Sequence, residues 1–366
     1  MPTSLSFSRC FLAASCFMVS IMIYVDSNHA VLRTVGSVSC VELRTTPLQQ
    51  LGLNHTSTSS IWRDGDPTNT STCEFQLQDA FNFHFPHTLQ QLYRCWSLWR
   101  DAPDPALVFP RQTLPDNHFI QGYIVTLQDA IGLNVLRRSD TATAAVPLVP
   151  PNAISADTFF RLPSPPYYAW SRPDDARALR DVIASSLGLS SRVGSSSVSC
   201  NGAPRIAVLN RHRTRELANV PDIVQALGGP SAASIHYFDS NTSFRDQIDF
   251  YYSHDIVISP HGAQLTGLPF LPNCGAVLEI FPAGYYLPHF FGSLAAAAQI
   301  QHGFLLATKS GDWVAEVQAG MYNSTTRNRV RNNTKKRPFC IAPTAIRSAV
   351  DQLVQQRNEC CSALQQ

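Results

Sequence analysis

The sequence has little charge. Charged residues make up 15% of the 366 residues, and the formal net charge at pH 7 is only +2. A nucleic-acid-binding protein needs a basic surface, so we expect no nucleic acid partner. Apolar residues are not scarce: 44% of the chain is hydrophobic, which excludes wholesale disorder and can fill the core of one large domain or two ordinary ones.

Several motifs that define common enzyme classes are absent from the sequence. It has no GxGxxG, no Walker loop, no HExxH and no GxSxG, which argues against dehydrogenases, P-loop enzymes, zinc proteases and serine hydrolases. It also has no CxxC pair, so neither a structural zinc site nor a thioredoxin-type motif is indicated. The chemistry must therefore come from another arrangement of residues.

The N-terminal region contains one uncharged apolar run, residues 10–25. Arg9 precedes it and Asp26 follows it, which predicts a membrane-spanning anchor with residues 1–9 in the cytoplasm and the rest of the chain in the lumen. At 1.5 Å per residue a helix of this length spans about 24 Å, short for a plasma membrane but compatible with thinner membranes. A cleaved signal peptide, cut after Ala30, is the alternative.

Glycosylation sequons and cysteines also favour a lumenal chain. Five Asn-X-Ser/Thr triplets are present, at Asn54, Asn69, Asn241, Asn323 and Asn332. The ten cysteines fit an oxidising compartment, where disulfides persist. Their pairing cannot be deduced from the sequence.

Composition divides the rest of the chain into three parts. Residues 26–70 are rich in Ser and Thr and lack a sustained period, which predicts a stem. Residues 71–173 contain short apolar runs and end in a Pro-dense stretch that excludes long helices, which predicts an irregular α/β lobe with a Pro-rich linker. Residues 174–366 are predicted to form a second, C-terminal lobe.

The C-terminal lobe shows regular alternation. Short apolar runs predict strands over 205–210, 234–238, 255–259, 276–280 and 303–307. Helical patterns fall at 174–188, 219–227, 243–253, 289–300 and 344–364, with a short helix ending at 271. Strands and helices that alternate at this spacing are typical of an α/β fold with a doubly wound parallel sheet, here Rossmann-like.

One loop of this lobe has the chemistry of an anion site. Residues 259–264 follow a predicted strand and precede a helix, and ligands of parallel sheets bind beyond the carboxyl ends of the strands. Gly262 and Ala263 let backbone N–H groups approach a phosphate, and His261 offers a hydrogen bond to it. The alternative is a tight turn with a satisfied histidine.

Other candidate side chains follow neighbouring strands. Glu279 ends one strand and suits a pair of sugar hydroxyls, although it could instead cap a helix or pair with arginine. Arginines that could neutralise a diphosphate, or be inert on the surface, are Arg211, Arg213 and Arg215. Carboxylates that could act as a general base, or lie on a helix surface, are Asp246, Asp249 and Asp255.

Taken in order, these residues resemble glycosyltransferase family 61. The resemblance covers residues 205–282 and consists of an Arg-rich strand end followed by Asn, a helix with Gln, an acidic residue before a strand, a His-Gly-Ala loop and a downstream Glu. The residues that carry it are Arg211, Arg215, Asn219, Gln247, Asp255, His261, Gly262, Ala263 and Glu279.

The resemblance implies a GT-B-like fold, in which two Rossmann-like lobes face a cleft, and sugar transfer with inversion and no strict need for a metal or other cofactor. It gives catalytic roles to His261 and Asp255. It gives donor-binding roles to Arg211, Arg215, Asn219, Gly262, Ala263 and Glu279. It also implies a single-pass type II protein of the Golgi or endoplasmic reticulum membrane, with its catalytic part in the lumen.

The expected reaction moves a sugar, xylose or GlcNAc, from a UDP-sugar to a hydroxyl of a glycan or glycoprotein. The alternative is a catalytically inactive lumenal protein of the same fold that binds glycans or nucleotide sugars. A secreted hydrolase is disfavoured because no nucleophile elbow and no paired catalytic carboxylates stand out.

Overall fold

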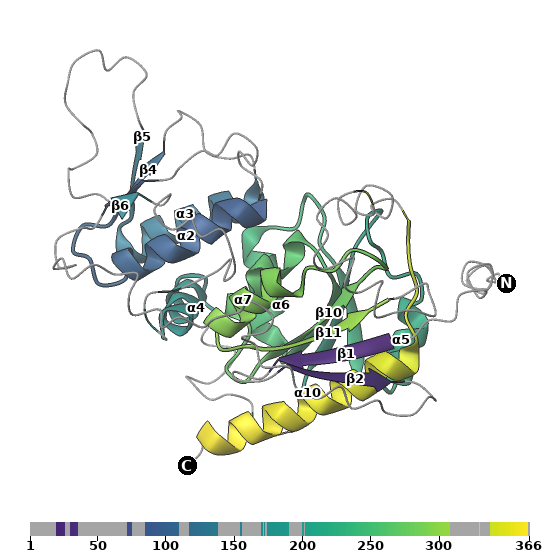
Figure 1. Cartoon of the computed structure of the whole chain (residues 1–366). Coiled ribbons are helices and arrows are strands. Elements are labelled where there is room, and N and C mark those ends of the chain that lie inside the picture. The colour runs from purple at the N-terminus through teal and green to yellow at the C-terminus, as the bar shows by residue number, and fades with distance from the viewer. Residues whose placement is uncertain are drawn as a thin grey trace.

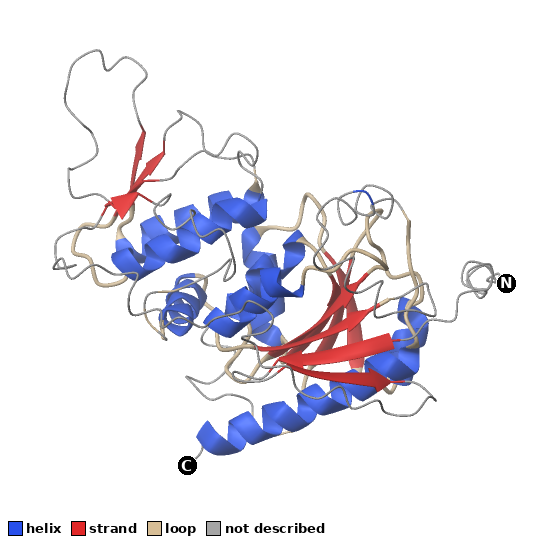
Figure 2. Ribbon diagram, in the orientation of Figure 1, coloured by secondary structure: helices blue, strands red, loops and turns tan. Residues whose placement is uncertain are grey.

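The computed structural model of the chain contains two β-sheets with helices packed around them (Figures 1 and 2). It describes residues 20–25, 30–35, 72–74, 85–109, 117–137, 154–155, 170, 172, 174–189, 200, 202–307, 329 and 337–364.

The larger sheet is built around five parallel strands. They are β7 (Ile206–Asn210), β8 (Ala233–Tyr237), β9 (Ile256–Pro260), β10 (Ala276–Phe281) and β11 (Gln301–Leu306). Their order across the sheet is β8-β7-β9-β10-β11, so the direction of winding reverses between β7 and β9. A reversal of this kind opens a crevice beyond the carboxyl ends of the two central strands, where α/β proteins bind their ligands.

Helices cover both faces of this sheet. One face carries α5 (Val220–Ala226) and α10 (Pro343–Leu364), and the other carries α6 (Phe244–Ser253), the 3-10 helix η5 (Ala263–Phe270) and α7 (Pro288–Ala297). Side chains of β10 alternate between the layers: Leu278 and Ile280 pack with α10, whereas Val277 packs on the η5 and α7 side. The predicted doubly wound lobe and its elements are confirmed, with bounds shifted by at most a few residues.

The smaller sheet is also parallel. Its strands are β3 (Thr72–Glu74), β4 (Ala106–Phe109), β5 (Asn134–Arg137) and β6 (Ile154–Ser155), in the order β5-β4-β3-β6. Its helices are α2 (Phe85–Trp99) and α3 (His118–Ile131). Asn117 caps α3 by accepting hydrogen bonds from the backbone N–H groups of Phe119 and Ile120, both at 3.1 Å. The lobe predicted to be irregular is therefore a second α/β unit.

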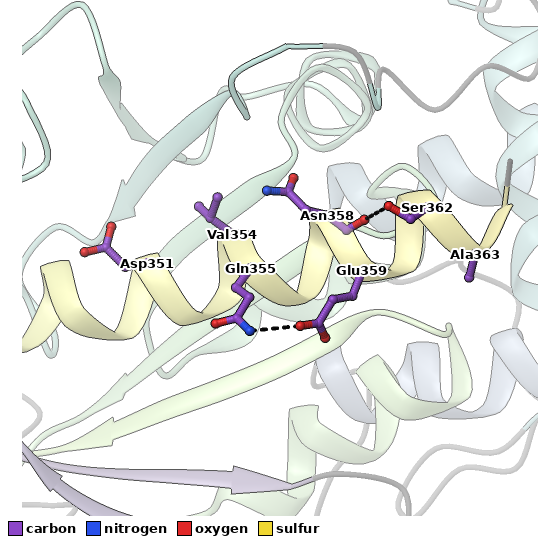
Figure 3. A pocket seen from close by; sticks show the side chains of 7 residues that line it. All are labelled: Asp351, Val354, Gln355, Asn358, Glu359, Ser362 and Ala363. Atoms are coloured by element: carbon purple, nitrogen blue, oxygen red, sulfur yellow. Dashed lines mark hydrogen bonds between the residues drawn. The ribbon is translucent and has the colours of Figure 1, made fainter.

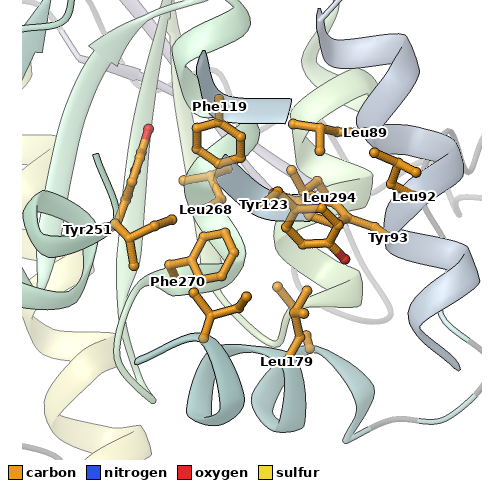
Figure 4. Packing of buried hydrophobic residues seen from close by; sticks show 14 of the residues in the cluster. Leu89, Leu92, Tyr93, Phe119, Tyr123, Leu179, Tyr251, Leu268, Phe270 and Leu294 are labelled. Carbon is orange, nitrogen blue, oxygen red and sulfur yellow. The ribbon is translucent and has the colours of Figure 1, made fainter. Parts of the chain in front are cut away.

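A single hydrophobic core joins the two units. Side chains of α2, α3 and α4 (Asp175–Ser186) interdigitate with those of η5, α6 and α7, as Figure 4 shows for Leu89, Phe119, Leu179, Phe270 and Leu294. The phenol of Tyr93 donates a hydrogen bond to the carbonyl of Thr266 across this contact, at 2.8 Å. The cleft predicted between the lobes stays a prediction, because the chain that follows β3, β4 and β5 lies outside the described residues.

The N-terminal strands differ from the prediction. Strand β1 (Ser20–Val25) pairs antiparallel with β11, and β2 (Ala30–Val35) pairs antiparallel with β1. The prediction of a membrane helix over 10–25 is therefore wrong for its last six residues, and the predicted stem includes strand β2. A short apolar run rich in β-branched residues fits a strand as well as a helix, and β11 offers it an edge to pair with. None of the described helices combines the length and apolarity that a bilayer requires.

Other N-terminal predictions fall outside the described residues. They are the cytoplasmic tail (1–9), the first part of the anchor (10–19), most of the stem and most of the Pro-rich linker.

Two disulfides fasten the C-terminal helix to the amino end of the large sheet, and a third joins β3 to α2. The pairs are Cys73–Cys95, Cys200–Cys361 and Cys274–Cys360, and Cys340 is disulfide-bonded as well. The neighbouring cysteines 360 and 361 of α10 thus reach two segments that are far apart in the sequence, one before β7 and one before β10. This pairing could not be read from the sequence.

We predict that the double variant Cys200→Ser/Cys361→Ser loses about 2–5 kcal/mol of unfolding free energy, because the disulfide restricts the unfolded chain. Urea unfolding followed by tryptophan fluorescence measures the loss. Reduction of the wild-type protein with dithiothreitol breaks the other disulfides as well and should lower its midpoint to that of the variant or below it. Equal midpoints of the oxidised wild type and the variant would contradict the prediction.

Candidate active site

The candidate site lies at the switch point between β7 and β9. Two side-chain amides fix the loops that follow these strands. The amide of Asn210 donates to the carbonyl of Leu217 at 3.0 Å and accepts from its N–H at 2.9 Å, which closes the loop after β7. The amide of Gln264 donates to the carbonyl of Leu209 and to the hydroxyl of Ser259, which ties the end of β7 to the loop after β9. Side chains on these loops are therefore held close together.

Arg211 is the cation nearest the His-Gly-Ala loop. Its Nε and Nη2 donate to the carbonyl and hydroxyl of Thr214 at 3.0 and 3.1 Å. Its Nη1 lies against Gly262, so closely that a Cβ at 262 would overlap the guanidinium. Among the described residues, no carboxylate comes within ion-pair distance of Arg211. Burial, together with the charge of Arg215, lowers its pKa to about 10, so the group stays cationic at neutral pH.

Arg215 is the second cation of the site, and together with Arg211 it forms what we call the positive edge. Its backbone is left-handed (φ 54°), and its guanidinium lies over the ring of Tyr285, 5.5 Å from the ring centre. Arg213, also left-handed, is exposed. Two of the three predicted arginines thus lie at the site. Because a half-buried cation is costly when no described carboxylate pairs with it, Arg211 favours an anion such as a phosphate, and Arg215 adds positive charge beside it.

His261 lies beneath these arginines. The side chain is almost fully buried, with its ring stacked on Phe281 and its edge toward Tyr285. Its Nδ1 is 2.5 Å from Oε1 of Glu279, and no described residue hydrogen-bonds to Nε2. Burial lowers the pKa of the imidazole, and the two guanidiniums lower it further against the opposite effect of Glu279. A neutral imidazole with a free Nε2 can accept a proton.

Glu279 does not take the predicted position beside a ribose. Its carboxylate is fully buried, and its second oxygen is 2.8 Å from Nε2 of His302 on the neighbouring strand. Burial raises its pKa, and this rise is opposed by His261 and Arg215. A carboxylate whose two oxygens both face imidazoles, with no surface exposed, cannot bind sugar hydroxyls. Its place in the fold is to orient His261.

Asp255 is wrong as a catalytic base. It lies at the start of β9, at the opposite end of the strand from His261, and six residues of extended chain separate the two by about 20 Å. Its carboxylate is 2% exposed and accepts from the backbone N–H and the guanidinium of Arg205 at 2.8 and 3.1 Å. Arg357 of α10 lies 3.6 Å away. Asp255 stabilises the amino end of the sheet.

Asn219 is also engaged elsewhere. Its amide donates to the carbonyl of Ile341 at 2.9 Å and accepts from the same residue's N–H at 3.3 Å. This pair holds the segment before α10 against the start of α5, so the prediction of a donor-binding Asn219 is not supported by its contacts. Gln247, on α6, likewise donates to the carbonyl of Thr242 and holds the loop after β8.

Two residues of the site were missed from the sequence, His302 and Tyr285. The signal for His302 was indirect: a glutamate inside a wholly buried strand needs partners, and adjacent strands are where they lie. Tyr285 gave no signal of its own, because the loop that carries it over Arg215 and His261 has no recognisable motif.

Of the predicted sequons, Asn241 lies in the described chain. It is exposed, in the loop between β8 and α6. The other four, Asn54, Asn69, Asn323 and Asn332, lie outside the described residues. Within the described part of the chain, no group of three or more His, Cys, Asp or Glu side chains could hold a metal ion.

A hollow of about 660 Å³ lies on α10, away from this edge (Figure 3). Its described lining residues all come from that helix: Asp351, Val354, Gln355, Asn358, Glu359, Ser362 and Ala363. Since α10 covers the face of the sheet opposite to η5 and α7, this hollow is not part of the site around His261.

Residues 82–278 match the profile of the family described as Glycosyltransferase 61, which is more than half of the chain. The chain belongs to glycosyltransferase family 61. The matched span includes β7, the arginine loop, β9 and the His-Gly-Ala loop, and it identifies the protein as a glycosyltransferase.

The chain is also similar to EGF domain-specific O-linked N-acetylglucosamine transferases. Identity to the Bos taurus enzyme is 34% over 87 residues, which is 23% of this chain and 16% of that protein. Identity to the Mus musculus enzyme is 34% over 85 residues, 22% of this chain and 16% of that protein. The matched stretch thus spans a small part of the length of these relatives.

We predict that Gly262→Ala weakens binding of pyrophosphate about 10- to 100-fold, because the added Cβ displaces the Arg211 guanidinium and one charged hydrogen bond is lost. Isothermal titration measures the affinity. Gly303→Ala is the matched control, since a Cβ there would meet Leu353 and Leu278 at ordinary contact distances of 3.5 and 3.6 Å. Equal loss in both variants would contradict the assigned role of Gly262.

Proposed function

We propose that the protein is an inverting glycosyltransferase that moves a sugar, xylose or GlcNAc, from a UDP-sugar to a hydroxyl of a glycan or glycoprotein. The observation that carries the proposal is the half-buried guanidinium of Arg211, which lies against Gly262 without an acidic partner among the described residues. At the switch point of a doubly wound sheet, such a cation suits the diphosphate of a nucleotide sugar.

His261 is the proposed general base. With Glu279 accepting from Nδ1–H, the lone pair of the imidazole lies on Nε2. The acceptor hydroxyl gives its proton to Nε2 while its oxygen forms a bond to the anomeric carbon. The bond from that carbon to the diphosphate oxygen breaks on the opposite face, and UDP leaves with the electron pair. Attack from the face opposite to the leaving group inverts the anomeric centre.

The arginines assist the leaving group. Negative charge develops on the diphosphate as the bond breaks, and preorganised donors at that position lower the barrier. Arg211 and Arg215 would provide the charge that a divalent cation provides in other transferases, so we propose that the reaction needs no metal. The sequence contains one Asp-X-Asp triplet, Asp64-Gly65-Asp66, outside the described residues, and the effect of EDTA on activity tests whether the reaction needs a metal.

The donor is proposed from the relatives. The similar enzymes are named as N-acetylglucosamine transferases, which supports GlcNAc as the sugar, and EGF-domain glycoproteins are one acceptor class to test. A location in the lumen of the Golgi or endoplasmic reticulum is supported by the three disulfides of the described chain and by the exposed sequon at Asn241. Attachment by an N-terminal helix over residues 10–25 is not part of the proposal, because residues 20–25 form strand β1.

The deciding experiment is a donor screen on the full chain. Nucleotide release is measured from UDP-GlcNAc, UDP-xylose and UDP-arabinose, with and without a mixed glycoprotein acceptor pool and with and without EDTA. We expect release that depends on the acceptor with one donor and is unchanged by EDTA. A folded protein that releases no nucleotide from any donor would instead be the inactive binding protein, and loss of activity in EDTA would refute metal independence.

We predict that Arg211→Ala raises the Kd for UDP about 10- to 100-fold, because a hydrogen bond between two charged groups is lost. Arg213→Ala is the matched control: it removes an arginine from the same loop, but an exposed one. Titration calorimetry compares the three proteins. An equal effect of both substitutions would mean that the loop attracts UDP only through its net charge.

A further inference from the structure

Three buried side chains on successive strands form one hydrogen-bonded line. His261 follows β9, Glu279 lies within β10 and His302 lies in β11. The distances are 2.5 Å from Nδ1 of His261 to Oε1 of Glu279, and 2.8 Å from Oε2 to Nε2 of His302. The side chains are 6%, 0% and 9% exposed, so water does not replace these partners. His302 is not needed for any step proposed above.

The position of His302 is fixed by packing. Its ring lies against Gly292 of α7, where a Cβ would come within 3.1 Å of Nδ1. On its other side the His302 ring faces the carboxylate of Glu279, so the ring is held between Gly292 and Glu279. A helix residue without a side chain at 292 is what lets His302 approach the glutamate.

Proton counting assigns the donors in this line. Burial lowers the pKa of His302 to about 4, so near neutral pH the ring carries a single N–H. Nε2 faces the carboxylate, so the proton belongs there and is donated to Oε2. With that oxygen satisfied, Oε1 is free to accept from Nδ1 of His261, and the lone pair of His261 then lies on Nε2.

We propose that His302 is a positioning residue of the transferase site: its Nε2–H holds Glu279 as an ionised acceptor and thereby keeps the lone pair of His261 on Nε2. The inference rests on the proposed role of His261 as the base. His302 touches neither donor nor acceptor and acts only through Glu279.

Without the His302 donor, the proton distribution reverses. A buried oxygen that has lost its hydrogen bond raises the pKa of Glu279. The protonated glutamate then donates to Nδ1 of His261, which must carry its own proton on Nε2 and cannot accept another. The other described charged or titratable groups around His261 are Arg211 and Arg215 from the loop after β7 and Tyr285 from the loop after β10. None of them contacts Oε2, so none replaces His302.

The test compares His302→Phe, which removes the donor, with His302→Gln, which keeps an N–H donor. The value of kcat/KM for the acceptor is measured as a function of pH at saturating UDP-sugar. Since the base must be deprotonated, its acidic limb should move to higher pH by about one to two units in His302→Phe and stay near the wild-type position in His302→Gln. UDP affinity at pH 7.5 should be unchanged in both, because the arginines are untouched.

A second measurement does not need activity. Long-range ¹H–¹⁵N NMR of the imidazoles, assigned with a His261→Gln variant, reports which nitrogen carries the proton. We expect Nδ1–H for His261 and Nε2–H for His302 in the wild type, and Nε2–H for His261 in His302→Phe. A wild-type His302 protonated on Nδ1 would overturn the inference even if His302→Phe fails to fold.

Two failures can be told apart. A wild-type protein that transfers no sugar from any donor refutes the proposed function, whatever the tautomers are. If the wild-type protein is active and the His302→Phe variant has the same acidic limb and the same His261 tautomer as the wild type, only the role of His302 is refuted.

Discussion

A carboxylate in the middle of a buried parallel strand has to be paired, and this requirement organises the site. Glu279 is fully buried between the strands that carry His261 and His302, and it is compatible with the fold only because an imidazole faces each oxygen. The pairing fixes the orientation of His261 at the carboxyl end of β9. The same hydrogen bonds that make the buried glutamate tolerable thus also orient the proposed base.

The positive edge above His261 follows from topology. Winding reverses between β7 and β9, so the loop with Arg211 and the loop with Gly262 meet. Glycine is needed there because the guanidinium occupies the space a Cβ would take. The amino end of the same sheet is built differently, with Asp255 between two arginines, and it serves stability. The sheet therefore has at one end Arg211, with no acidic partner among the described residues, and at the other end a carboxylate paired with two arginines.

The sequence predicted the C-terminal lobe well because each strand there is a short apolar run bounded by a turn, and burial on both faces makes that pattern unambiguous. It also pointed to Arg211, Arg215, His261 and Gly262, which come soon after strands and which the structure places close together. It failed where position within a strand decides the role. Asp255 and Glu279 both lie near strands, but only the paired register shows that one is at the wrong end and the other inside the core. The strand at Ser20–Val25 was missed because an apolar run does not show that β11 offers a sheet edge with which it can pair.

The two disulfides of α10 have a consequence for biosynthesis. A chain made from the N-terminus exposes Cys200 and Cys274 for 161 and 86 residues before their partners in the last helix are made. During that interval the two thiols have no native partner and can pair only wrongly, with each other or with another cysteine. Native pairing of both cysteines must therefore wait until α10 has been made and lies on the sheet, so a wrong early pair has to be undone by thiol–disulfide exchange.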